Sequence, residues 1–369
     1  MNTIDTMRDT LHNPEQLVAD WKAQGKKIVG YRCIYVPEEI IWAAGMWPYP
    51  IFGTPEAITQ ADSYFQPCTC EFIRNIFDHA LDGKFNFLDG LVLCNTCDAV
   101  RHLYDMWITY IKVPDCHIIN NPQKMYDESG YKYYCVELKR FKSEMENLSG
   151  NGISDESLQS AINLHNQTRG LLKELYSLRK KDPPLISGGE ALDIVMASML
   201  MPKDKCNQQL QQLIAEVKTR ESPKTRGPRI LITGSIIDDP TLIQLVEEVG
   251  GVVVADDLCT TTKYFWQEVG QNKDPLDALS RYNTERCLCS CMHPPERRFD
   301  YLWELIEEFG ANGVIYFNLK YCHPFLYEAA LFREKLAAKD IPTLILEVDH
   351  SLSGLGQLRT RIQAFIEML

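Results

Sequence analysis

Several of the thirteen cysteines in this 369-residue chain follow segments with the composition of buried strands. Residues 91–94 form an apolar run that leads into Cys94-Asn95-Thr96-Cys97, and residues 313–317 form another that leads towards Cys322. Further closely spaced thiols are Cys68, Cys70, Cys287, Cys289 and Cys291. Open α/β sheets bind their ligands at the carboxyl ends of the strands. Thiols gathered there from both halves of a chain predict a soft metal centre, and an iron–sulfur cluster in particular.

The same cysteines are compatible with three simpler roles. Cys94 and Cys97 alone fit a thioredoxin-like redox pair, which leaves Cys70, Cys289 and Cys322 unexplained. A structural zinc site usually has two tight cysteine pairs around a short loop, so the long separations here fit it less well. A buried, inert thiol is the default for any single cysteine. We apply it to Cys33, Cys116, Cys135 and Cys206.

The composition is that of an ordinary globular protein, with 45% hydrophobic and 24% charged residues. The length predicts two domains. The formal charge of −12 argues against a nucleic-acid partner, which usually meets a basic face. We find no signal-like N-terminus and no apolar run near the ~18 residues of a membrane span. We therefore expect a soluble cytoplasmic protein, in which thirteen cysteines are not a disulfide framework.

Short apolar segments alternate with helical patterns, which predicts the α/β class with two doubly wound, Rossmann- or flavodoxin-like parallel sheets. The predicted domains are an N-terminal α/β domain (1–150), a helical connector (151–222) and a C-terminal α/β domain (223–369). The Pro-containing stretch 222–228 is the best linker candidate. The cluster is expected in the cleft between the two domains.

No nucleotide-binding fingerprint is present. Thr233-Gly234-Ser235 ends a predicted strand and resembles a phosphate-binding turn, but a tight βα turn is the better explanation. The chain has neither GxGxxG after a strand nor GxxxxGK[ST]. We therefore predict that this chain binds no nucleotide, and that any ATP used in its chemistry is bound by another polypeptide.

Five segments together resemble a known family. They are the run 35–48 (YVPEEIIWAAGMWP), Cys70-Glu71-Phe72-Ile73-Arg74, Cys97-Asp98 with Tyr104-Asp105, Asp256-Asp257-Leu258-Cys259, and residues 313–315 with Cys322, Ile341-Pro342, Glu347 and Asp349. The combination is similar to the 2-hydroxyacyl-CoA dehydratase/benzoyl-CoA reductase family over nearly the whole chain.

The resemblance implies a 4Fe–4S cluster beside a CoA-thioester pocket, with Cys70, Cys97 and Cys322 as ligands. Cys289 or Cys291 is a candidate fourth ligand, and some members of the family leave one iron open. The surplus of thiols, Cys68 and Cys94 included, is compatible with a double-cubane 8Fe–9S centre, as in a further branch of the family, or with simple packing.

The resemblance also implies partners. These are a homologous second subunit or a second copy of the chain, an ATP-hydrolysing iron–sulfur activator, and ferredoxin or flavodoxin as the electron source. The predicted activity is ATP-driven reduction of an aromatic acyl-CoA, as in benzoyl-CoA reductase. The alternatives are dehydration of a 2-hydroxyacyl-CoA through a ketyl radical, a double-cubane reductase, and a simple electron-transfer protein.

Three residues are candidates for catalysis near the thioester. Tyr35 and Glu38 belong to the N-terminal signature, although Glu38 and Glu39 also suit the start of a helix. His323 directly follows a proposed ligand. It could donate a hydrogen bond to a cluster sulfur or to the substrate, or simply occupy an exposed turn.

Overall fold

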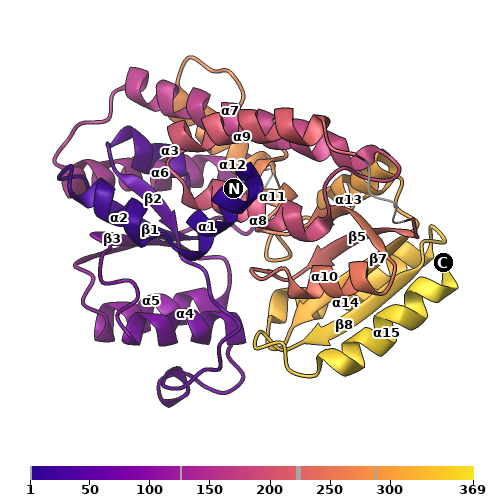
Figure 1. Cartoon of the computed structure of the whole chain (residues 1–369). Helices are drawn as coiled ribbons and strands as arrows, with labels where there is room; N and C mark the ends of the chain where they lie inside the picture. The colour runs from indigo at the N-terminus through magenta and orange to yellow at the C-terminus, as the bar shows by residue number, and fades with distance from the viewer. Residues whose placement is uncertain (1, 125–126, 222–225, 287–288) are drawn as a thin grey trace.

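The computed structural model describes residues 2–124, 127–221, 226–286 and 289–369 (Figure 1). It contains two four-stranded sheets whose strands pair in parallel, each flanked by helices. The predicted fold class, α/β with two doubly wound parallel sheets, is therefore confirmed.

The N-terminal sheet has the strand order β2-β1-β3-β4. Its strands are β1 (Ile28–Arg32), β2 (Trp47–Pro50), β3 (Gly90–Cys94) and β4 (Asp115–Ile119). The helices described in this half are α1 (Thr3–His12), α2 (Glu15–Lys22), α3 (Glu38–Ala43), the short 3₁₀ turn η1 (Ala61–Ser63), α4 (Glu71–Leu81), α5 (Asp98–Tyr110) and α6 (Glu128–Ser149). In Figure 1, α4 and α5 lie below this sheet and α3 and α6 lie above it.

The C-terminal sheet repeats the same topology, in the order β6-β5-β7-β8. Its strands are β5 (Arg229–Gly234), β6 (Val252–Asp257), β7 (Gly313–Leu319) and β8 (Thr343–Val348). The helices of this half are α10 (Thr241–Glu248), α11 (Thr262–Phe265), α12 (Pro275–Glu285), α13 (Glu296–Phe309), α14 (His323–Ala337) and α15 (Leu355–Met368).

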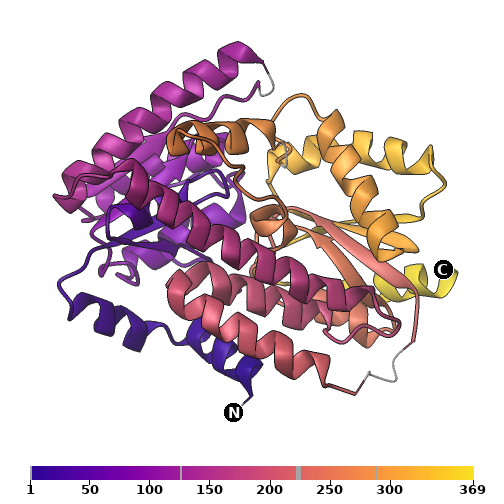
Figure 2. The same ribbon diagram turned by 90° about the horizontal axis from the view of Figure 1, so that it is seen from above.

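Helices between the two sheets run across both halves of the molecule. They are α7 (Asp155–Ser177), η2 (Leu178–Lys180), α8 (Gly188–Leu200) and α9 (Lys203–Lys218). Figures 1 and 2 both show α7 extending from the N-terminal sheet to the C-terminal one, and it packs against α3 at one end and α11 at the other. These helices fall within the proposed connector, 151–222. Its C-terminal boundary, like most of the proposed linker, falls at residues 222–225, outside the described residues.

Burial on both faces explains the composition of the central strands. All positions of β3 and β7 are buried, as parallel strands covered by helices on both sides require. β2 is different, because its sequence Trp-Pro-Tyr-Pro holds two prolines that cannot donate to a ladder. It pairs only with β1 and forms the edge of the sheet, where proline is tolerated.

The strand order places a switch point in each sheet. In the N-terminal sheet β1 lies between β2 and β3, and in the C-terminal sheet β5 lies between β6 and β7. Consecutive connections therefore leave in opposite directions at β1 and β5, which opens a crevice at their carboxyl ends. Both crevices contribute residues to one cavity, described next.

Candidate functional site

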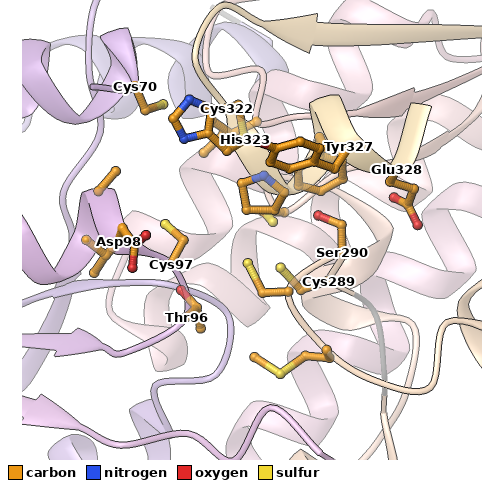
Figure 3. Close-up of a pocket in the computed structure, with 18 of the residues that line it drawn as sticks. Cys70, Thr96, Cys97, Asp98, Cys289, Ser290, Cys322, His323, Tyr327 and Glu328 are labelled. Atoms are coloured by element: carbon orange, nitrogen blue, oxygen red, sulfur yellow. The ribbon is translucent and has the colours of Figure 1, made fainter. Parts of the chain in front are cut away.

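A cavity of about 520 Å³ lies between the two halves and is lined by both of them. Within the described parts of the chain, seven of its lining residues are cysteines: Cys33, Cys70, Cys97, Cys259, Cys289, Cys291 and Cys322. Figure 3 shows Cys70 and Cys97 entering from N-terminal elements on one side, and Cys289 and Cys322 from C-terminal elements on the other. All four cysteines predicted as ligands, Cys70, Cys97, Cys322 and Cys289, therefore meet at this cavity.

Three of these cysteines stand at the beginnings of helices. Cys70, Cys97 and Cys322 are the N-cap residues of α4, α5 and α14. None of them makes a side-chain capping hydrogen bond of ordinary geometry. The first turn of a helix carries unsatisfied N–H groups and the positive end of the helix dipole, which together favour a bound anion or a thiolate. Three such ends therefore face one cavity.

The thiols of Cys70 and Cys322 interact across the two halves of the chain. The Cys322 thiol donates to Cys70, which lowers the pKa of Cys70, and the N–H groups of Ile73 and Phe72 lower it further. The same interaction, together with burial, raises the pKa of Cys322, whereas Ser235 and the N–H of Phe325 oppose that rise. Cys70 is thus the member of the pair that is predisposed to be a thiolate.

A second contact joins Cys289, Cys291 and Cys97. Hydrogen bonding from Cys291 lowers the pKa of Cys289 to about 6, with further help from Lys263 and Arg298. Cys291 is within hydrogen-bonding reach of both Cys289 and Cys97, and these contacts raise its own pKa. The hydrogen bonds from Cys291 are therefore the main reason that Cys289 favours the thiolate, and the two cations add to their effect.

Cys33 and Cys259 form another part of the wall. Cys33 directly follows β1 and has a φ of 103°, a conformation uncommon for a residue with a side chain. A hydrogen bond from the buried Cys94 lowers the pKa of Cys33. Burial raises the pKa of Cys259 to about 12. The sequence led us to expect Cys33 to be a packing thiol, and it suggested no ligand role for Cys259.

Position relative to the strands could have identified both residues. Cys33 is the first residue after β1, and Cys259 follows β6 by two residues. The other thiols expected to be packing residues, Cys116, Cys135 and Cys206, do not line the cavity, and Cys68 is exposed outside it.

Cationic side chains surround the cavity. Arg32 lines it and stacks on Phe72, with its guanidinium carbon 4.6 Å from the ring centroid. Arg298 pairs with Glu328 and donates to the carbonyl oxygen of Cys289 at 2.8 Å. The buried ammonium of Lys263 lies 3.4 Å from Asp257. Arg32 and Arg298 are thus cationic residues of the cavity wall, and Arg298 is paired there with Glu328, which also lines the cavity.

The three residues predicted for catalysis lie in different places. His323 lines the cavity and stands near Tyr327, with the ring centroids 6.3 Å apart (Figure 3). Glu38 and Tyr35 are buried and are not lining residues. Glu38 accepts a hydrogen bond from Tyr31 at 2.9 Å and pairs with Lys203 at 3.2 Å. The hydroxyl of Tyr35 donates to the carbonyl oxygen of Arg286.

As they stand, the side chains of the described residues include no group of three or more His, Cys, Asp or Glu arranged to hold a metal ion. The cavity thiols instead contact one another, as described above. Within that same part of the chain, no helix is both long enough and apolar enough to cross a membrane.

Comparisons with known proteins agree on one family. Residues 33–369 match the model of the family described as 2-hydroxyglutaryl-CoA dehydratase, D-component. The chain is 28% identical to the (R)-phenyllactyl-CoA dehydratase beta subunit of Clostridium sporogenes, over 99% of this chain and 98% of that one. It is 26% identical to a subunit of the benzoyl-CoA reductase of Thauera aromatica, over 95% and 93% of the two chains. It is also 26% identical to the beta subunit of the (R)-2-hydroxyglutaryl-CoA dehydratase of Acidaminococcus fermentans, over 99% and 98%. The chain belongs to this family, and the resemblance seen in its motifs is confirmed.

Proposed function

We propose that this member of the 2-hydroxyglutaryl-CoA dehydratase D-component family is an iron–sulfur subunit of an enzyme that acts on an acyl-CoA thioester. The observation that carries the proposal is the convergence of seven cysteines from both halves of the chain on one cavity. A simple packing role does not explain why these thiols line a cavity, because packing thiols are surrounded by other side chains.

The donor set fits an iron–sulfur cluster. A 4Fe–4S cluster is held by cysteine thiolates, and the cavity offers more than four. Cys70, Cys97, Cys322 and Cys289 are the proposed ligands. The lowered pKa values of Cys289 and Cys70 favour the thiolate form that ligation requires, and the helix ends behind Cys70, Cys97 and Cys322 favour a negatively charged group in the cavity.

The residues of the chain would hold and shield the reacting centre. A bound cluster would supply single electrons at low potential. The three helix N-termini, with Arg32 and Arg298, would stabilise its negative charge. His323 lines the cavity and is the proposed proton donor or hydrogen-bond donor there. Glu38 and Tyr35 remain predictions, and their positions away from the cavity wall suit a supporting role better than contact with a substrate.

Within this proposal, the primary reaction is reduction of an aromatic acyl-CoA, as the N-terminal signature and the relative named benzoyl-CoA reductase suggest. Elimination of water from a 2-hydroxyacyl-CoA is the alternative, and it is supported by the relatives named dehydratase beta subunits. Each of these relatives is named as one subunit of its enzyme, which supports a second subunit as partner. An activator and a ferredoxin or flavodoxin would supply the electrons. Assay of the assembled enzyme with benzoyl-CoA and with phenyllactyl-CoA distinguishes the two reactions, since only the second releases water.

A double-cubane reductase is a second candidate, favoured by one specific observation. Cys33 and Cys259 line the cavity in addition to the four proposed ligands and Cys291. A single cubane leaves these three thiols without a role, whereas an 8Fe–9S centre would use most of them.

The test is the iron and acid-labile sulfide content of anaerobically purified protein, with an EPR spectrum after reduction by dithionite. About four of each per chain supports one cubane, and about eight iron atoms supports the double cubane. Cys70→Ala, Cys97→Ala and Cys322→Ala should each lower the iron content, while Cys116→Ala and Cys135→Ala, which lie away from the cavity, should not. Zinc, or no metal in fully reconstituted protein, would refute the proposal.

A further inference from the structure

The thiols of the cavity are divided between the two halves of the chain. Cys70 precedes α4 in the N-terminal half, and Cys322 precedes α14 in the C-terminal half. Their distance therefore depends on how the two halves are held together. Contacts next to the cavity that fix the two halves relative to each other would therefore determine how firmly a cluster is bound.

Asp238 and His350 form a buried pair on which such a contact rests. Asp238 follows β5 and His350 follows β8, so both belong to the C-terminal half. His350 Nε2 lies 2.9 Å from Asp238 Oδ1, and only 5% and 4% of the two side chains are exposed. Asp238 Oδ2 accepts a hydrogen bond from the N–H of Gly53, in the N-terminal half, at 2.9 Å. One carboxylate thus bridges the two halves.

Gly53 lies close to the side chains of His350 and Asn75. A Cβ atom there would lie 2.8 Å from His350 Cε1 and 2.8 Å from Asn75 Oδ1. The loop that contains Gly53 therefore packs directly on the Asp238–His350 pair and excludes water from that pair. A hydrogen bond to a charged group is stronger in such a site than in the open solvent.

A second bridge reaches the residue next to Cys70. The N–H of His350 donates to Glu71 Oε2 at 2.6 Å, and Glu71 is the first residue of α4, with Cys70 as its N-cap. The His350 ring also contacts Phe72, with ring centroids 5.4 Å apart. Phe72 in turn carries Arg32 on its face, at the cavity wall. His350 thus holds the start of α4 from the far side of the wall.

The charges around the pair favour a charged His350. Burial opposes protonation, but Asp238, Glu71 and Asp239 together raise the pKa of His350 above its ordinary value. Burial likewise opposes ionisation of Asp238, but His350, Arg32 and the N–H of Gly53 lower its pKa. At pH values between the pKa of Asp238 and the pKa of His350, the two side chains therefore form an ion pair.

We propose that Asp238 and His350 are positioning residues that clamp Cys70 and its helix against the C-terminal half, and so hold the thiols of the cavity at the spacing that binds the cluster. The inference rests on the proposed function, because it assumes that the cavity holds a cluster. Ser235, three residues before Asp238 in the loop between β5 and α10, contacts Cys322.

Two variants and a control test the proposal. His350→Gln retains a donor towards Asp238 without the charge, and His350→Ala removes the side-chain donor and the ring that packs on Phe72, while the backbone N–H of His350 to Glu71 remains in both variants. Arg8→Gln breaks an ion pair of similar length, Arg8 with Asp193 at 2.6 Å, between α1 and α8. The measurements are the rate of cluster transfer to an excess of the iron chelator bathophenanthroline and hydrogen–deuterium exchange of the metal-free protein at residues 51–56 and 71–81.

His350→Ala loses the charge-assisted hydrogen bond that orients Asp238 towards Gly53, and it loses the ring contact with Phe72. Cluster release should therefore be about 10- to 100-fold faster in His350→Ala, with His350→Gln between it and the wild type. Exchange should rise at both segments in the metal-free variants, and Arg8→Gln should alter neither measurement. Release from the wild type should also accelerate as the pH rises through the folded-state pKa of His350, because neutral His350 holds Asp238 less strongly. His350→Gln should lack this step.

Equal release rates and equal exchange in wild type and His350→Ala would overturn the clamp. Increased exchange without any change in cluster release would also overturn it, because the contact would then be structural only. Absence of iron from the wild type would instead refute the proposed function, and the exchange experiment, which needs no cluster, would still report on the contact between the halves.

Discussion

The buried ion pair between Arg179 and Asp256 offers a quantitative test of how the connecting helices are fixed to the C-terminal sheet. Both side chains are fully buried, and Arg179 Nη1 lies 2.6 Å from Asp256 Oδ2. Tyr176 also donates to Asp256, at 3.0 Å, and Arg179 Nη2 donates to the carbonyl oxygen of Val253. Asp256 belongs to the Asp-Asp-Leu-Cys motif of the family resemblance, so the pair gives that motif a structural role.

Asp256→Asn preserves the size of the side chain and leaves Arg179 as a buried charge without a counter-charge. Removing one member of a buried pair costs about 3–5 kcal/mol, because the remaining charge is desolvated without compensation. Replacing both members by apolar residues of similar size, Asp256→Leu with Arg179→Met, should cost far less than two single changes added together, since no buried charge remains.

The assay is urea unfolding followed by the fluorescence of the six tryptophans and by far-ultraviolet circular dichroism. Arg359→Gln is the control, because Arg359 and Glu248 form an exposed pair at 2.7 Å with 47% and 59% of their side chains accessible. Such a pair is worth at most about 1 kcal/mol. The reasoning is refuted if Asp256→Asn is no more destabilising than Arg359→Gln, or if the double replacement costs the sum of the two singles.

Two further changes test a buried charge and a backbone constraint. Burial opposes ionisation of Glu39, yet Arg169 and His165 lower its pKa to about 2, below the ordinary 4.5, so its stabilising effect is complete above pH 4.5 and is lost as the pH falls towards 2. Acid titration of unfolding should therefore show the stability gap between wild type and Glu39→Gln narrowing over that window, and a constant gap would contradict the assignment. Gly234→Ala should abolish soluble expression or cost several kcal/mol, because φ is +124° and a Cβ would lie 1.9 Å from the carbonyl oxygen of Phe317, whereas Gly170→Ala meets nothing within 4 Å. Comparable stability of the two alanine variants in thermal unfolding would show that the constraint at Gly234 is wrong.

The sequence predicted the central strands β5 and β7 more readily than β2 and β4, the two edge strands of the N-terminal sheet. β5 and β7 are continuous apolar runs between turn residues, and both were expected where they occur. β2 was not expected, because it contains two prolines. Proline argues against a strand unless the strand is known to lie at the edge of a sheet. β4 is exposed or half-buried at four of its five positions, so it lacks the continuous apolar run of a buried strand.

The cysteines were predictable as a group for a physical reason. Strand ends can be located along a sequence, and parallel topology brings all carboxyl ends to the same side of a sheet. Which thiols share a cavity depends on how the two sheets are placed, and that placement brings in Cys33 and Cys259. Glu38 was a candidate both for catalysis and for the start of a helix. It is the first residue of α3, and its carboxylate accepts a hydrogen bond from Tyr31 and pairs with Lys203 in the core, contacts that depend on the tertiary structure.

The three cysteines at helix N-caps connect the stability of the fold with its proposed chemistry. Serine, threonine, aspartate or asparagine at an N-cap stabilises a helix by about 1 kcal/mol relative to residues that do not cap. Cys70, Cys97 and Cys322 forgo ordinary capping hydrogen bonds at three helices that begin at one cavity. A single poor cap has no functional meaning, but these three helices place the positive ends of their dipoles around a cavity lined by seven thiols. A bound anionic cluster would interact favourably with these helix ends, so it would offset in the loaded protein part of the cost of the missing side-chain caps.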